Sequence, residues 1–198
     1  MIEEVEKKLK RKNKILFSRE SACLRELVER IRLQKHRTLV LWAFECVKTP
    51  LALFESRYPN EARPRTAVEL CHKWAQGDIK MPVAKRAILD CHGVCKEMDD
   101  PYGAALCHAI GQGVSTVHVE THAIGLPIYE LSAIVINNRE AYQEKLDDKI
   151  LYYIDTLCYF QEHLEQFDYP WADFLLREDV PNKEDVLWKE KLEHNRFR

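Results

Sequence analysis

The sequence predicts an all-α protein, a multi-helix bundle packed around a central apolar helical segment at about residues 102–137. First, residues 104–137 carry only two formal charges, Glu120 and Glu130, in a chain of which 31% of the residues are charged. Second, apolar residues recur at spacings of three and four along the flanking segments, which is typical of amphipathic helices. Third, β-branched runs such as residues 134–136 are short and lie within a helical pattern, so no strand is expected.

Charge is distributed unevenly along the chain. The net charge is −2, which argues against a surface devoted to nucleic acid. Residues 1–37 hold twelve Lys or Arg against six Asp or Glu, whereas residues 138–198 hold nine against fifteen. We expect a single α-helical domain over residues 1–198, with a basic N-terminal arm at 1–33 and an acidic C-terminal helical extension at 138–198.

The start of the chain lacks the features of a secretory leader, because it is acidic and then basic without an apolar core. No run of about eighteen apolar residues could span a bilayer. The seven cysteines are odd in number and lie among apolar neighbours, so reduced, buried thiols are expected. These observations predict a cytoplasmic protein without a membrane partner, and they do not define an oligomeric state.

The N-terminal half reads as a series of helices. Residues 2–16 form a charged helix or arm, and residues 20–33 form an amphipathic helix. From His36 to Pro59 the pattern predicts one long helix, and Pro50 should kink it near residues 46–50 without ending it. The side chains expected to face inward in the long helix are Leu39, Trp42, Cys46, Leu53 and Phe54.

Proline and glycine mark the boundaries of the next helices. Pro64 suits a first helical turn and Gly77 a position just past a helix end. Pro82 starts another helix, and Asp100 followed by Pro101 is typical of a cap followed by a first-turn proline. In the helix that starts at Pro82, the expected inward residues are Val83, Ala87, Ile88, Cys91 and Val94 or Cys95.

The centre is expected to be one or two helices, bent or broken around its glycines. Glycine costs about 1 kcal/mol relative to alanine within a helix, so glycines here indicate that a neighbouring helix approaches closely. Asn137-Asn138 begins an acidic amphipathic helix that reaches about Phe167. A short turn and a final segment at 180–198 complete the chain.

Three histidines, His108, His118 and His122, lie within the central segment. On a continuous helix His118 and His122 form an i, i+4 pair that could share a metal ion. His108 is about 15 Å away along such a helix, so further ligands must come from another helix. Cys91, His92 and Cys95 are the candidates, and the metal set considered is Cys91, Cys95, His118 and His122.

The alternative is that these histidines are structural. His118 and His122 should then be at least partly buried, and Glu45 or Glu69 could hold one of them by a charge-assisted hydrogen bond. We favour this reading, and expect no cofactor. Arg63 and Arg65 flank a helix start, where an ion pair that tethers the loop is favoured over an anion site.

No nucleophile elbow, phosphate loop, dinucleotide fingerprint or EF-hand occurs in the sequence. A set of less common residues does recur in a fixed order. Its members are H-x5-WA from His36, LFE-x2-YP from Leu53, RPR-x-A from Arg63, W-x2-G from Trp74, and the two pairs His118-Val119 and His122-Ala123. In this order, over about residues 36–137, the chain resembles the bacterial immunity protein five-like family.

The resemblance implies an all-helical protein that neutralises a toxin encoded beside it, by binding and not by catalysis. The acidic C-terminal third could then meet a basic toxin, through Glu144, Asp147, Asp148, Glu162, Glu165 and Asp168. Candidate binding residues are His36, Trp42, Glu45, Arg63, Arg65, Trp74, His92, His118 and His122.

Two alternatives stay open. One is a helical-bundle enzyme, or a protein that binds a small ligand or metal, using the His/Cys cluster in a pocket between helices. The other is binding of nucleic acid by the basic arm, which we consider unlikely because no aromatic residue is interleaved with residues 7–14.

Overall fold

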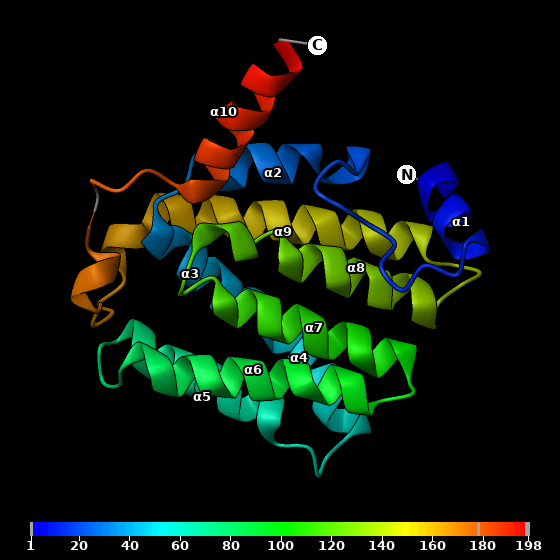
Figure 1. The fold of residues 1–198 in the computed structure, drawn as a ribbon, viewed down its shortest axis with the longest axis horizontal. Coiled ribbons are helices and arrows are strands. Elements are labelled where there is room, and N and C mark those ends of the chain that lie inside the picture. The colour runs from blue at the N-terminus through cyan, green and yellow to red at the C-terminus, as the bar shows by residue number, and fades with distance from the viewer. Residues whose placement is uncertain (1, 178, 197–198) are drawn as a thin grey trace.

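The computed structural model describes residues 2–177 and 179–196, and over these residues it contains helices and no strand. The expected fold class is therefore confirmed (Figure 1). The α-helices are α1 (Ile2–Lys10), α2 (Arg25–Ile31), α3 (His36–Cys46), α4 (Lys48–Arg57), α5 (Arg63–Ala75), α6 (Met81–Glu97), α7 (Pro101–Ser115), α8 (Gly125–Asn137), α9 (Gln143–His163) and α10 (Lys183–Arg196). Short 3-10 turns are η1 (Ala22–Leu24), η2 (Glu120–His122), η3 (Leu164–Gln166) and η4 (Asp173–Leu175).

Helix α7 forms the centre of the bundle. It packs against α3, α4, α5, α6 and α8, and in Figure 1 it runs between α6 and α8. Its side chains Leu106, Ile110 and Val114 are buried. At Gly113 an added Cβ atom would lie 2.3 Å from Cγ1 of Val47. The central glycine therefore allows the close approach that the sequence predicted.

The central segment is broken between α7 and α8. Helix α7 ends at Ser115, and Val119 has an extended backbone with φ −160° and ψ 140° before η2 begins. The β-branched residues in this stretch, whose side-chain rotamers a helix restricts, favour such a break. His118 and His122 therefore do not share a helical face, so the i, i+4 pair that could have shared a metal ion is not formed.

Where the sequence predicted a kink near Pro50, the structure has a boundary between two helices. Helix α3 ends at Cys46 and α4 starts at Lys48, with Val47 between them. Pro50 then lies in the first turn of α4, where a missing backbone N–H costs little.

Two side chains that were expected to face inward are exposed, Leu53 at 43% and Val83 at 49%. Leu53 lies on the opposite face of α4 from Leu51, and Val83 lies in the first turn of α6.

The C-terminal segment returns to the start of the chain. Helix α9 begins at Gln143, a few residues later than expected, and packs on α2, α3 and α8. Helix α10 then projects from the bundle beyond α2 (Figure 1). The side chain of Asn182 donates hydrogen bonds to the carbonyl oxygens of Ile31 and Gln34, and Arg19 pairs with Glu184. These contacts attach residues 182–184 to the region around α2.

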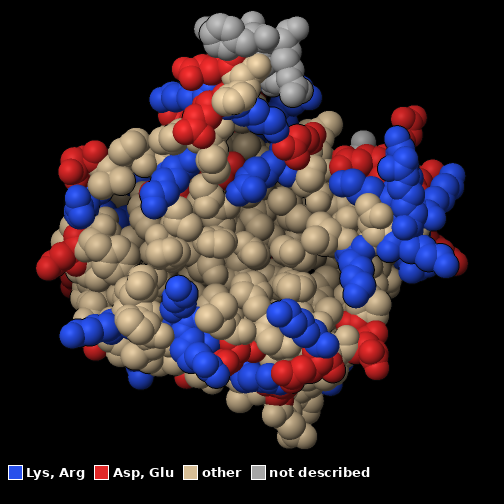
Figure 2. All heavy atoms as spheres, in the orientation of Figure 1, with Lys and Arg blue, Asp and Glu red and all other residues tan. Residues whose placement is uncertain are grey.

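The surface of the face in Figure 2 has an uncharged area over α7 and α8, with charged side chains around it. Among the described residues, no helix combines the length and the apolar character needed to cross a membrane.

Candidate functional site: a cationic cleft

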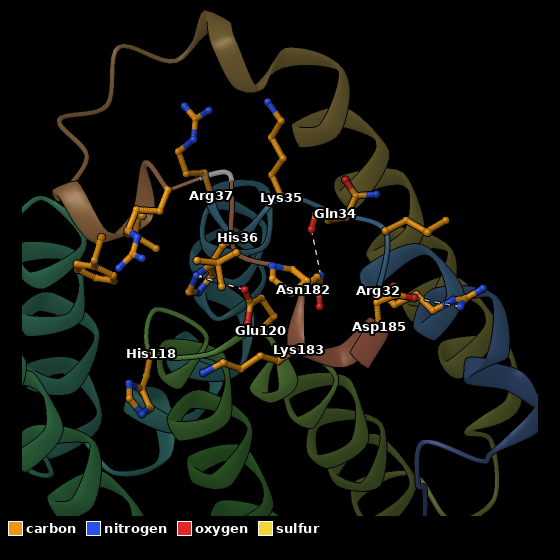
Figure 3. A pocket seen from close by; sticks show the side chains of 16 residues that line it. Arg32, Gln34, Lys35, His36, Arg37, His118, Glu120, Asn182, Lys183 and Asp185 are labelled. Carbon is orange, nitrogen blue, oxygen red and sulfur yellow. Dashed lines mark hydrogen bonds and ion pairs between the residues drawn. The ribbon is translucent and has the colours of Figure 1, made fainter. Parts of the chain in front are cut away.

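A cleft of about 520 Å³ lies where three distant segments meet. One wall is the α2–α3 connection with the first two residues of α3, residues 32–37, and a second comes from residues 118 and 120, between α7 and α8. The third wall is formed by residues of the segment 174–185 at the end of the chain. Figure 3 shows these walls around His36 and Glu120.

His36 and Glu120 lie together in the cleft (Figure 3). Nε2 of His36 is 2.6 Å from the carbonyl oxygen of Thr116, and Nδ1 is 3.6 Å from the Glu120 carboxylate. Glu120 is only 5% exposed. The contacts of His36 with Thr116 and Glu120 join the start of α3 to the α7–α8 connection.

Cations surround this pair. The cleft is lined by five Lys or Arg residues and two acidic ones, a difference of +3 with histidine neutral. The five are Arg32, Lys35, Arg37, Arg177 and Lys183.

Most of these cations have carboxylate partners. Arg32 pairs with Asp185 at 3.3 Å, and Lys35 and Arg37 contact Glu165 at 3.5 and 3.1 Å. Glu165 is 67% exposed, so solvent screens it.

The cationic side chains do not converge on one point. In Figure 3, Lys35 and Arg37 extend away from the His36–Glu120 pair on one side. Lys183 runs beneath the pair toward the side where His118 lies, and Arg32 is on the far side beside Asp185. The charge is therefore spread around the cleft and is not focused on a single small anion.

Apolar side chains also line the cleft. Leu33 is 72% exposed, Val180 44% and Phe174 38%. Phe174 stacks on the buried Trp74, with ring centroids 5.5 Å apart, and His118 lies 6.1 Å from the same indole. Trp74 thus supports one wall from behind.

Two of the nine candidate binding residues, His36 and His118, line this cleft, and Trp74 supports it. Trp42 is fully buried and donates from Nε1 to the carbonyl oxygen of Tyr153. Glu45 pairs with Lys48 at 2.6 Å, and Glu69 is exposed. Within the described part of the chain, neither glutamate forms the expected hydrogen bond with a histidine.

Arg63 and Arg65 form the ion pairs that the sequence favoured. Arg63 contacts Glu61 and Glu97, both at 2.6 Å, and Arg65 contacts Glu55 at 2.5 Å. The pKa of Arg63 is raised above its usual value, chiefly by the hydrogen bond with Glu61. These pairs join the start of α5 to the preceding loop, to α6 and to α4.

The central histidines differ in exposure and in position. His118 is exposed, so the expectation that it is buried is wrong, while His122 is half-buried. Nδ1 of His122 is 2.9 Å from Oε1 of Gln112, and burial lowers the pKa of this histidine. Among the described residues, His92 and Cys95 lie with His108, and not with His118 or His122. The metal site suggested by the sequence, with Cys91, Cys95, His118 and His122 as ligands, is therefore not assembled.

Sequence reasoning missed several residues of the cleft. Arg32 and Arg37 belong to the basic run RLQKHR between two helices, a signal that could have been used. Glu120, Phe174 and Lys183 have no local signal, because only the fold brings them to His36.

The acidic residues that the sequence suggested as a toxin-binding surface are all exposed. Glu165 faces the cations of the cleft, and the others are Glu144, Asp147, Asp148, Glu162 and Asp168.

The fold is an all-helical bundle with a cleft, and the class of protein follows from the sequence match. The chain belongs to the family described as Imm-5 like putative immunity protein, whose profile matches residues 29–156. This match extends beyond both ends of residues 36–137, which carry the resemblance. Neither the curated proteins nor the solved structures searched contain a match.

Proposed function

We propose that this protein is an immunity protein that binds a protein toxin and blocks its activity, and that the cationic cleft is the surface that contacts the toxin. The observation that carries the proposal is the spread of the cations around a cleft that also exposes Leu33, Phe174 and Val180. Small-ligand sites place a few polar groups so that they converge. Dispersed charges with apolar anchors between them fit an acidic segment of a protein partner better.

The existing ion pairs do not oppose such binding. Exposed pairs such as Lys35–Glu165 contribute about 0.2–1 kcal/mol, so carboxylates of a partner can replace Glu165 at small cost. The cationic cleft would also speed association with an acidic surface. We propose that binding takes place in the bacterial cytoplasm, where the seven free thiols would stay reduced.

The test is co-expression with the toxin encoded by the neighbouring gene, followed by growth rescue and binding kinetics with the purified pair. Lys35→Glu combined with Lys183→Glu should lower the association rate about tenfold or more and weaken its salt dependence. Lys85→Glu combined with Lys96→Glu is the matched control, because these exposed lysines lie on α6 outside the cleft.

Two outcomes would contradict the proposal. If the two proteins do not associate, and co-expression does not rescue growth, the proposal that this protein binds the toxin is wrong. If Asp147→Lys with Asp148→Lys abolishes binding while the cleft variant binds normally, the toxin contacts the acidic surface of α9 and the cleft assignment fails.

A further inference from the structure

Helices α6 and α7 lie side by side and bring three metal-binding side chains together (Figure 1). His92 and Cys95 are three residues apart on α6 and so share one of its faces. His108 comes from α7, and its ring centroid is 5.6 Å from that of His92. One ligand atom from each of His92, Cys95 and His108 lies within 4.8 Å of the other two.

We infer that His92, Cys95 and His108 form a zinc-binding site between α6 and α7. Two imidazole nitrogens and one thiolate sulfur are donors that suit Zn²⁺, whereas Mg²⁺ and Ca²⁺ prefer oxygen. Tetrahedral Zn²⁺ with bonds of about 2.0–2.3 Å needs ligand atoms roughly 3.3–3.8 Å apart. All three side chains are half-buried, so small side-chain rotations can close the remaining distance.

Neighbouring groups hold both histidines in place. The ring of His108 stacks on Tyr129, with centroids 4.7 Å apart. The ring of His92 lies against Gly111, where a Cβ atom would be 2.4 Å from Cε1 of His92. Contacts of this kind restrict ring orientation, and fixed ring orientation is what a metal ligand requires.

Two of the three proposed ligands also line a cavity of about 290 Å³. Cys95 and His108 line this cavity together with Ile15, Met98 and Tyr129. A water molecule or a small ligand can reach the ion from there, as in zinc sites with three protein ligands. The thiol of Cys107 donates to the carbonyl oxygen of Cys91 at 3.1 Å, and its sulfur is not part of the group of ligand atoms that lie within 4.8 Å of one another, so we do not assign it as a ligand.

This site is separate from the proposed toxin-binding surface, because none of its three ligands lines the cationic cleft. Zinc would join α6 to α7 whether or not the cleft binds a toxin. The two proposals can therefore fail independently.

The first test is titration of the chelator-treated full-length protein with Co²⁺, followed by Zn²⁺. One equivalent of Co²⁺ should give intense visible bands of a four-coordinate ion and a thiolate charge-transfer band, and Zn²⁺ should abolish both. Cys95→Ser should remove the charge-transfer band, and His92→Asn or His108→Asn should weaken binding more than about 100-fold. His118→Gln and Cys107→Ala are controls that should bind as the unmodified protein does.

The second test needs no variant, so it remains decisive if a substitution prevents folding. Zn²⁺ should slow alkylation of Cys95 by iodoacetamide, as followed by peptide mass spectrometry. Alkylation of the half-buried Cys23 and Cys158 should not change. Absence of the Co²⁺ bands, or equal alkylation of Cys95 with and without Zn²⁺, would show that these side chains form only a polar contact between helices.

Discussion

The imidazole of His92 occupies the space that a side chain at Gly111 would fill, since a Cβ atom there would lie 2.4 Å from Cε1 of His92. His92 is half-buried, so its ring can rotate away from an added methyl group. We expect Gly111→Ala to change the free energy of unfolding by less than about 1 kcal/mol and to weaken Co²⁺ binding about tenfold or more. Urea unfolding and Co²⁺ titration of the same preparation measure the two effects.

Gly113 provides the contrast two residues further along α7. A Cβ atom there would lie 2.3 Å from Val47 and 2.6 Å from Leu126, and both neighbours are fully buried. Gly113→Ala should therefore cost about 1–3 kcal/mol by overpacking and leave Co²⁺ affinity unchanged. If Gly111→Ala and Gly113→Ala changed the free energy of unfolding and the Co²⁺ affinity equally, the role given to Gly111 would be contradicted.

A buried ion pair joins α8 to α9. Nζ of Lys149 is 2.8 Å from Glu130, which also accepts a hydrogen bond from the hydroxyl of Tyr153. Burial raises the pKa of Glu130. Because each single change strands the other partner, Glu130→Gln and Lys149→Met should each cost about 3 kcal/mol, and the double variant less than their sum. A double-mutant cycle from urea unfolding measures this, and additive costs would mean that the pair is not coupled.

The protonation of His122 makes stability depend on pH. Burial, then the charges of His118 and Arg19, lower the pKa of His122 below its usual 6.5. As pH falls from about 6.5, the unfolded chain takes up a proton before the folded protein does, so stability should decrease until the folded pKa is passed.

Thermal unfolding between pH 7.5 and 5 should thus show a falling Tm, with a shallower fall in His122→Gln. Some slope should persist, because burial lowers the pKa of His72 as well.

Asp100 caps α7. Its carboxylate accepts hydrogen bonds from the backbone N–H groups of Tyr102 and Gly103 and from the hydroxyl of Tyr58. Asp100→Ala should cost about 0.5–2 kcal/mol in chemical unfolding. Asp99→Ala is the neighbouring control, and an equal loss there would argue against capping.

Local signals were sufficient for much of the fold. The cap at Asp100 and the positive φ of 84° at Gly77 follow from residue chemistry at single positions. The inward positions of α2, Leu27, Val28 and Ile31, follow from spacing. Periodicity does not locate the points where the chain changes direction. The helical pattern runs on through Val47, and the expected break around the central glycines lies instead between Ser115 and η2.

The candidate site was much less accessible to this reasoning. His36 belongs to the residues that carry the family resemblance, whereas its partner Glu120 has no local signal, because only the fold brings η2 to the start of α3. The zinc ligands show a similar limit. Cys95 and His92 were recognised, yet their pairing with His108 depends on how α6 and α7 align, and no pattern within either helix specifies that alignment.

The cationic cleft is a composite structure. One of its walls is lined by residues 174, 175, 177, 180–183 and 185, which lie outside residues 29–156, the part that matches the family. They are attached by the two hydrogen bonds of Asn182, by the stacking of Phe174 on Trp74 and by the buried Leu175. Substitutions within this terminal stretch can therefore reshape one wall of the cleft without changing any residue of the part that matches the family.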